Sequence, residues 1–295
     1  MAKKTDEVRP SAVQVWILAT RPNTLTLSFT PVLVGAALVA KELGRIEALP
    51  SVLFWIFAAL IQIGTNLHND YSDFVKGADT DERVGQARAT QKGWLTAEQT
   101  LRGALTSLCG AVAVGAYLAS RPGCAFFMTF VVITSTFNAV AYTGGFPLTL
   151  VGLGSLSLGY SGLGDLFVLL YFGYVATFVP FFLQLPQYPP FLLVIAATSM
   201  GFLASGVMVV NNLRDRRTDV KANKRTLAVR FGQKLARAQY AFLLVSFSKI
   251  LHSFFLKVGA YAAPVAAVVS KCAPRSWLLV LLSLPLAVSL SFFEN

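Results

Sequence analysis

The chain has 295 residues, of which 55% are hydrophobic and only 13% are charged, and its mean hydropathy is +0.61. Because about a quarter of the residues in an average soluble domain are charged, this composition excludes a soluble globular enzyme and indicates a membrane protein. The net charge of +11 does not indicate nucleic-acid binding, because the sequence contains no soluble basic domain that would provide such a site.

The apolar segments are continuous rather than alternating, and several reach the ~20 residues that a helix needs to cross a bilayer. Unpaired backbone groups are costly in lipid, so spanning segments are helices or closed barrels, and the continuous runs exclude a barrel. The sequence therefore predicts an all-α, polytopic membrane protein. Residues 1–15 are expected to form a polar N-terminal tail and residues 16–295 a single transmembrane domain.

The predicted spans follow the apolar runs in chain order. They cover residues 16–39, with an oblique entry at Arg21-Pro22, then 50–66, 101–119, 123–143, 165–185 and 191–212, and less clearly 238–256, 258–271 and 276–293. Polar loops are expected over residues 71–100 and 213–237. Residues 144–162 are rich in glycine and carry no charge, which favours a loop or a re-entrant segment.

Two acidic stretches each follow an apolar run. Residues 66–83 contain Asp70, Asp73, Asp79, Asp81 and Glu82, and residues 211–219 contain Asp215 and Asp219. Asn69 and Asp73 are four residues apart, and this spacing places two side chains on one face of a helix. Asp215 and Asp219 have the same spacing. Each stretch is therefore predicted to present a pair of oxygen ligands in one direction, whereas Asp81 and Glu82 are interpreted as ordinary loop charges.

The distribution of Lys and Arg predicts the orientation of the spans. With the amino terminus on the cytoplasmic side, residues 1–21, 71–102 and 213–237 lie on that side and contain four, five and nine basic residues. The opposite loops contain only Lys41, Arg45 and Arg121. Cytoplasmic loops are enriched in Lys and Arg, so this orientation is favoured, and it brings both acidic stretches to the same face.

Oxygen ligands without cysteine indicate Mg²⁺ or Mn²⁺ at the acidic stretches. Mg²⁺ usually shares its carboxylates with substrate phosphates, so a diphosphate would balance the charge of the two acidic pairs. Basic side chains bind the non-bridging oxygens of a diphosphate. The basic candidates are Lys76, Arg83, Arg88, Arg214, Lys224 and Arg225. The alternative is that these residues only reflect membrane topology.

Several neighbouring residues have two interpretations. His68 lies one turn from the first acidic pair, but without a second histidine nearby a surface or packing role is expected. Tyr71 and Tyr142 either line an aromatic acceptor pocket or anchor the protein at the membrane interface. Asp165 either caps the helix that starts there or takes part in catalysis.

The residue pattern of both motifs resembles that of the UbiA superfamily of intramembrane aromatic prenyltransferases. The superfamily pattern is carried by Asn69-x3-Asp73-x5-Asp79 and Asp215-x3-Asp219. Residues 69–83, Arg88-Ala89-x-Gln91-x-Gly93, 211–215 and 224–232 are similar to the 1,4-dihydroxy-2-naphthoate prenyltransferase branch, and so are residues 21–25, 142–145 and 162–165. The resemblance extends from residue 14 to residue 240.

The resemblance implies a bundle of about nine transmembrane helices around a central cavity that is open to lipid. It also implies Mg²⁺-dependent transfer of a polyprenyl group from polyprenyl diphosphate to 1,4-dihydroxy-2-naphthoate. The acceptor loses CO₂, and the product leads to menaquinone or phylloquinone. The membrane would be the plasma membrane of a bacterium or an organelle membrane, such as that of a plastid, in a eukaryote.

The resemblance further implies roles for individual residues. Metal ligands would be Asn69, Asp73, Asp79, Asp215 and Asp219, and catalytic residues would be Asp70, Asp73 and Asp215, with Asp70 orienting or deprotonating the acceptor. The basic candidates together with Gln91 would bind the diphosphate. The acceptor pocket would contain Asn66, Tyr71, Tyr142 and Asn212.

Two segments depart from the family pattern. The link between Gly145 and Gly159 is longer than usual, and residues 281–287 resemble the penultimate helix although the chain ends at Asn295. Either an extra span precedes these residues or the final helix is missing.

Other functions remain open from the sequence. The acceptor could instead be another aromatic acid such as 4-hydroxybenzoate, and the donor could carry a phytyl chain. A phosphoalcohol transferase normally gathers its acidic residues in one motif, and a transporter carries them near the bilayer midplane, so both fit the two acidic stretches less well.

Overall fold

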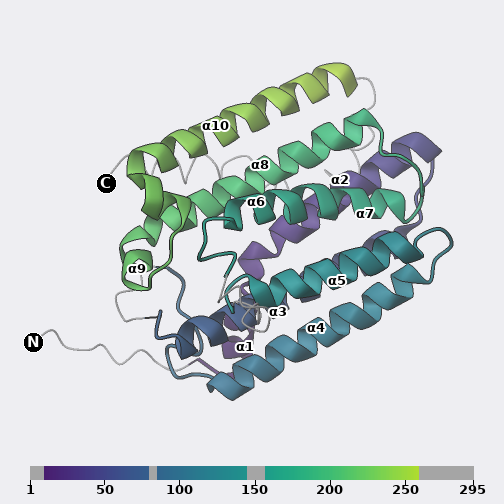
Figure 1. The fold of residues 1–295 in the computed structure, drawn as a ribbon. Coiled ribbons are helices and arrows are strands. Elements are labelled where there is room, and N and C mark those ends of the chain that lie inside the picture. The colour runs from purple at the N-terminus through teal and green to yellow at the C-terminus, as the bar shows by residue number, and fades with distance from the viewer. Residues whose placement is uncertain (1–9, 80–84, 145–156, 259–295) are drawn as a thin grey trace, which may run out of the picture.

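A computed structural model describes residues 10–79, 85–144 and 157–258, and all of its regular elements are helical (Figure 1). The α-helices are α1 (Ala12–Thr20), α2 (Thr26–Leu43), α3 (Ala48–Val75), α4 (Ala97–Ala119), α5 (Ala125–Ala141), α6 (Gly164–Val168), α7 (Ala176–Phe182), α8 (Phe191–Arg214), α9 (Arg216–Lys221) and α10 (Leu227–Val258). A 3₁₀ turn (Pro22–Thr24) precedes α2, and a π-helical segment (Leu169–Val175) joins α6 to α7. The predicted all-α class is confirmed.

Five helical segments in the described part of the chain are long and apolar enough to cross a membrane: α2, α3, α4, α8 and the continuous helix Gly164–Phe182. Helix α5 is apolar but has only 17 residues. These segments confirm a polytopic membrane protein. The predicted total of nine spans also depends on the segments near residues 258–271 and 276–293, which lie almost entirely outside the described residues, as does most of the long link between Gly145 and Gly159.

The helices extend further into the polar segments than the sequence predicts. Helix α3 continues to Val75 instead of ending at residue 66, because its acidic end is buried against neighbouring segments rather than dissolved in water. The predicted loop over residues 213–237 is wrong in part, since it contains α9 and the first turns of α10. Helix α1 starts at Ala12, inside the predicted tail, because Val15 packs in the core.

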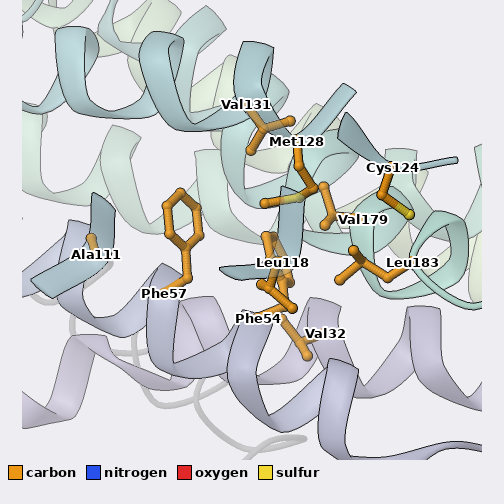
Figure 2. Packing of buried hydrophobic residues seen from close by; sticks show 10 residues of the cluster. All are labelled: Val32, Phe54, Phe57, Ala111, Leu118, Cys124, Met128, Val131, Val179 and Leu183. Atoms are coloured by element: carbon orange, nitrogen blue, oxygen red, sulfur yellow. The ribbon is translucent and has the colours of Figure 1, made fainter. Parts of the chain in front are cut away.

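The helices pack side by side into one bundle (Figure 1). Helix α8 packs along α10 and along the π-helical segment, and α3 packs along α4 and α5. Figure 2 shows the main core, in which α2, α3, α4, α5 and α7 contribute side chains such as Val32, Phe54, Leu118, Met128 and Val179. Because lipid is as apolar as these side chains, close van der Waals packing rather than hydrophobic burial holds such helices together.

The crossing of α2 and α7 depends on Gly35. A Cβ atom at Gly35 would overlap the backbone carbonyl oxygen of Thr177, which has no freedom to rotate away. At Gly110 in α4 an added Cβ would meet only the Leu60 side chain at 3.4 Å, an ordinary contact. Small residues let two helix backbones approach closely, and of these two glycines Gly35 is the one used in this way.

We therefore expect Gly35→Ala to lower the free energy of unfolding by about 1–3 kcal/mol, the usual cost of overpacking. The matched change Gly110→Ala should leave the stability unchanged or raise it, because alanine is the better helix former by ~1 kcal/mol. Denaturant unfolding of the purified proteins in mixed micelles measures both. Equal unfolding midpoints for the two variants would contradict the close crossing.

Candidate active site

A cavity of about 330 Å³ opens among α2, α3, α5, the π-helical segment and α8. Its lining residues on α3 run from Phe54 to Asp73, about 28 Å along the helix axis. The deep part is apolar and contains Phe54 and Phe57, and the π-helical segment adds Phe172 to its wall. The other end carries amides, carboxylates and basic side chains. The cavity therefore joins a charged mouth to an apolar interior.

The structure brings residues from both acidic stretches to this cavity. The predicted site residues that line it are Asn66, Asn69, Asp73, Arg88, Tyr142, Asn212, Arg214, Asp215, Asp219 and Lys224. The two stretches lie far apart in sequence, but both line this cavity and each contacts a residue next to the other, which confirms the prediction that they share one end of the bundle. Lys224 Nζ lies 2.9 Å from Asp73 Oδ2, and the Arg214 guanidinium packs against Gly85.

Other predicted site residues lie beside the cavity without lining it. These are Asp70, Tyr71, Lys76, Asp79, Gln91 and Arg225, whereas Arg83 lies outside the described residues. The Lys76 ammonium donates to the Thr143 carbonyl oxygen, and the Arg225 side chain is exposed. Direct contact with a substrate in the cavity would require these side chains to move, so their predicted roles remain predictions.

Arg88 is the cation at the centre of the first acidic stretch. Its Nη1 lies 2.6 Å from Asp73 Oδ2 and 2.8 Å from Asp79 Oδ2, and its Nε lies 3.3 Å from Asp70 Oδ1. The side chain is buried. Burial alone would lower the pKa of Arg88, but the carboxylates, led by Asp73, raise it above its ordinary value. Arg88 therefore stays charged and neutralises carboxylates that would otherwise repel one another.

Asp70 is held between two arginines. Besides Arg88, it forms an ion pair with Arg21, which lies between α1 and the 3₁₀ turn in a left-handed backbone conformation (φ 55°). Left-handed conformations are uncommon for a residue other than glycine and often occur at functional sites. Arg21 and Arg88 both line the cavity, so the Asp70 carboxylate is connected to the cavity through these two partners.

Three donors surround the Asp73 carboxylate. Oδ2 accepts hydrogen bonds from Arg88 and Lys224, and Oδ1 accepts one from the Tyr160 hydroxyl at 2.7 Å. Burial and the Asp73 carboxylate raise the pKa of the Tyr160 phenol, so the hydroxyl keeps its proton. A carboxylate offers roughly four acceptor positions, two on each oxygen. Both positions on Oδ2 and one on Oδ1 are used, so one position on Oδ1 is left for a further ligand.

The second acidic stretch lies at the junction of α8 and α9. Asp215 ends α8, and the Asp219 N–H donates to the Asp215 carbonyl oxygen at 2.8 Å, so the two residues lie one helical turn apart and both line the cavity. Arg214 binds the Asp215 carboxylate with both Nε and Nη2, at 2.8 and 2.7 Å. The Lys224 N–H donates to the Asp219 carbonyl oxygen at 2.8 Å, which fixes the start of the basic segment on this turn.

Two of the residues with two interpretations are resolved by their contacts. His68 is buried and packs against Gly144, so its role is packing. Asp165 does not cap α6, because Leu163 is the N-cap residue and has no side-chain cap. The Asp165 carboxylate instead accepts hydrogen bonds from Gln239 at 3.2 Å and Asn212 at 3.5 Å. It thereby ties α6 to α8 and α10.

The donor set suits a divalent cation only in part. Asn69, Asp73, Asp215 and Asp219 supply hard oxygen atoms at one cavity, but the described residues contain no cluster of three His, Cys, Asp or Glu side chains that would hold a metal ion by themselves. Mg²⁺ is usually bound by one or two carboxylates together with substrate phosphates. The residues therefore fit a cation that is shared with a diphosphate and do not fit a closed protein site.

Tyr160 and Arg21 are site residues that the sequence does not predict. Tyr160 lies in an uncharged glycine-rich segment, where no charge and no spacing of polar residues marks it. Arg21 carries a signal, because it is a charged residue at the entry of a predicted span, where unpaired charges are costly.

Comparison with known proteins agrees with this geometry. The UbiA prenyltransferase family matches residues 28–293. The 1,4-dihydroxy-2-naphthoate octaprenyltransferase of Escherichia coli is 36% identical over 244 residues, which cover 81% of this chain and 75% of that protein. The protein of the same name from Mycobacterium tuberculosis is 34% identical, over 85% of this chain and 83% of that protein. The one from Bacillus subtilis is 30% identical, over 78% of this chain and 70% of that protein. A solved digeranylgeranylglyceryl phosphate synthase shares the fold, with a TM-score of 0.50 and 15% identity over 81% of this chain and 75% of that one.

The contacts of Arg88 generate a stability prediction. Arg88→Ala leaves buried carboxylates without their cation, and breaking a buried pair in this way costs about 3–5 kcal/mol. The control is Arg102→Ala, whose partner Glu98 lies on the helix surface, with the Arg102 side chain 76% exposed. That exposed pair should contribute little. Thermal unfolding in detergent compares the two variants, and a similar small shift in both would show that Arg88 is not the central cation.

Proposed function

Since the chain belongs to the UbiA prenyltransferase family and is an integral membrane prenyltransferase, we propose that it transfers a polyprenyl group from its diphosphate to 1,4-dihydroxy-2-naphthoate. The observation that carries this proposal is the meeting of two acidic stretches at the mouth of one apolar cavity. The names of the relatives from three bacteria support the acceptor and the polyprenyl donor. The product would then be a precursor of menaquinone or phylloquinone.

The two ends of the cavity suit the two ends of the donor. The polyprenyl chain is apolar and would lie against Phe54, Phe57 and Phe172. The diphosphate would lie at the charged mouth, where Arg214 and Lys224 offer positive charge. Arg88 lines the mouth as well, but its Nη1 is bound to the carboxylates of Asp73 and Asp79, so we assign it to holding the site rather than to binding the diphosphate.

We propose that Mg²⁺ binds at the mouth together with the diphosphate. The cation would be held by Asn69 and Asp73 of the first stretch and by Asp215 and Asp219 of the second. Asp79 would not reach the cation directly, because it lies outside the cavity and is paired with Arg88. When bound, Mg²⁺ supplies positive charge that stabilises the departing diphosphate. The carboxylates of this chain orient that charge toward the leaving group.

The reaction we propose begins with cleavage of the bond between the allylic carbon and the diphosphate oxygen. Negative charge grows on the diphosphate, where Arg214 and Lys224 already lie, and such preorganised charge lowers the barrier. The apolar wall keeps water from the allylic cation. The electron-rich naphthol ring then forms the new carbon–carbon bond and loses its carboxylate as CO₂.

The acceptor would lie between the mouth and the apolar wall. Asn66, Tyr142 and Asn212 line this part of the cavity. The Tyr71 ring faces His68, with ring centroids 6.2 Å apart, so Tyr71 supports the wall from outside the cavity. Asp70 would act on the acceptor through Arg21, its ion-pair partner at the cavity, rather than as a base in direct contact.

We further propose that the mouth faces the cytoplasm. The described basic residues from Lys76 to Arg102 and from Arg214 to Arg237 belong to segments at that end, and the positive-inside rule favours the cytoplasmic side for them. In a bacterium this membrane would be the plasma membrane, and in a eukaryote an organelle membrane such as that of a plastid.

The acceptor and the donor are tested by a substrate panel with the purified protein. With Mg²⁺, octaprenyl diphosphate and 1,4-dihydroxy-2-naphthoate, we expect release of CO₂ and a prenylated naphthol, and no product when Mg²⁺ is removed with EDTA. Mass spectrometry identifies the product. Turnover with 4-hydroxybenzoate but not with the naphthoate, or with phytyl diphosphate alone, would replace this assignment by another member of the same family.

The roles of the two stretches are tested by Asp73→Asn and Asp215→Asn. Each change keeps the side-chain shape but removes the charge, so each should lower kcat/KM by about 100-fold or more. Glu98→Gln, on the exposed face of α4, is the matched control and should retain full activity. If both aspartate variants turn over at near-normal rates while remaining folded, the shared cation site is wrong.

A further inference from the structure

Tyr160 contacts both the first acidic stretch and the basic segment that follows the second one, although it belongs to neither motif. Its hydroxyl donates to Asp73 Oδ1 at 2.7 Å, on the oxygen that neither Arg88 nor Lys224 uses. The side chain also lines the cavity. Because the other two donors hold Oδ2, the Tyr160 hydroxyl decides how Oδ1 is turned toward the cavity.

The ring of Tyr160 contacts two ammonium groups. Lys76 Nζ is 4.9 Å from the ring centroid and Lys224 Nζ is 4.8 Å from it. A cation within about 6 Å of an aromatic face is attracted to it. Lys76 belongs to the first acidic stretch and Lys224 follows the second, so one ring contacts a cation from each of these segments.

The backbone around Tyr160 is fixed to the basic segment that follows the second acidic stretch. The Arg225 N–H donates to the Tyr160 carbonyl oxygen at 2.8 Å, and Arg230 Nη2 donates to the Ser161 carbonyl oxygen at 2.7 Å. Gly162 has a φ of +83° and allows this turn to approach the Arg225 carbonyl oxygen. Tyr160 is therefore anchored to this basic segment by its backbone and to the first acidic stretch by its side chain.

We propose that Tyr160 is a positioning residue that aims the Asp73 carboxylate at a divalent cation and holds the Lys224 ammonium in place for a diphosphate. This inference rests on the proposed function of the site. The hydroxyl and the ring have separate tasks. The hydroxyl acts on the metal ligand, and the ring acts on Lys224, the cation at the cavity that would meet the diphosphate oxygens.

Two variants of the full-length protein in detergent separate these tasks. Tyr160→Phe removes the hydroxyl and keeps the ring, so Mn²⁺ binding, measured by electron paramagnetic resonance at saturating inorganic diphosphate, should weaken about tenfold or more, as is usual when the partner of a metal ligand is lost. Tyr160→Leu removes the ring as well, so inorganic diphosphate binding at saturating Mn²⁺, measured by calorimetry, should weaken clearly further than in Tyr160→Phe.

Tyr188→Phe is the control, because this tyrosine is 96% exposed in the link before α8, and both affinities should equal those of the wild type. Mn²⁺ binding by Tyr160→Phe at wild-type affinity would overturn the role of the hydroxyl. Equal diphosphate affinities for the two Tyr160 variants would overturn the role of the ring. Neither measurement uses the acceptor, so failure of the wild type to prenylate the naphthoate would affect the proposed reaction and leave this result standing.

Discussion

The placement of one buried cation among three carboxylates is the constraint on which the rest of this site depends. Asp70, Asp73 and Asp79 come from a single helix end, and their mutual repulsion in a buried position must be neutralised. Arg88 does so, and the segment that carries it is pressed against α3 because Ala89 and Leu95 pack with Leu67. A stretch that composition assigns to a solvated loop thus becomes a wall of the cavity.

Much of the framework was predictable because the bilayer imposes simple rules. Long apolar runs must be helices, and basic residues mark one side, so the sequence alone predicts that both acidic stretches share one end of a bundle. The Lys224–Asp73 contact confirms this. The four-residue spacing of Asp215 and Asp219 also predicts their stacking, because it depends only on helix geometry and not on partners elsewhere in the chain.

What the sequence could not predict depends on contacts between distant segments. The end of α3 was placed too early because its last turns carry carboxylates, and their burial becomes plausible only once Arg88 and Lys224 are known to neutralise them. Asp70 looked like a base in contact with substrate, yet two arginines hold it. Tyr160 had no charge, period or motif to mark it, since its importance comes from which groups converge on it.

The ion pair between Asp73 and Lys224 joins residues that are 151 positions apart. During synthesis, α3 enters the membrane long before Lys224 leaves the ribosome, and in that interval the only cations at hand for its acidic end are near it in sequence, above all Arg88. Local pairs form before distant ones because closing a long loop costs more entropy. The site therefore assembles in order. The first acidic stretch is neutralised by Arg88 first, and the second half of the protein then packs against it.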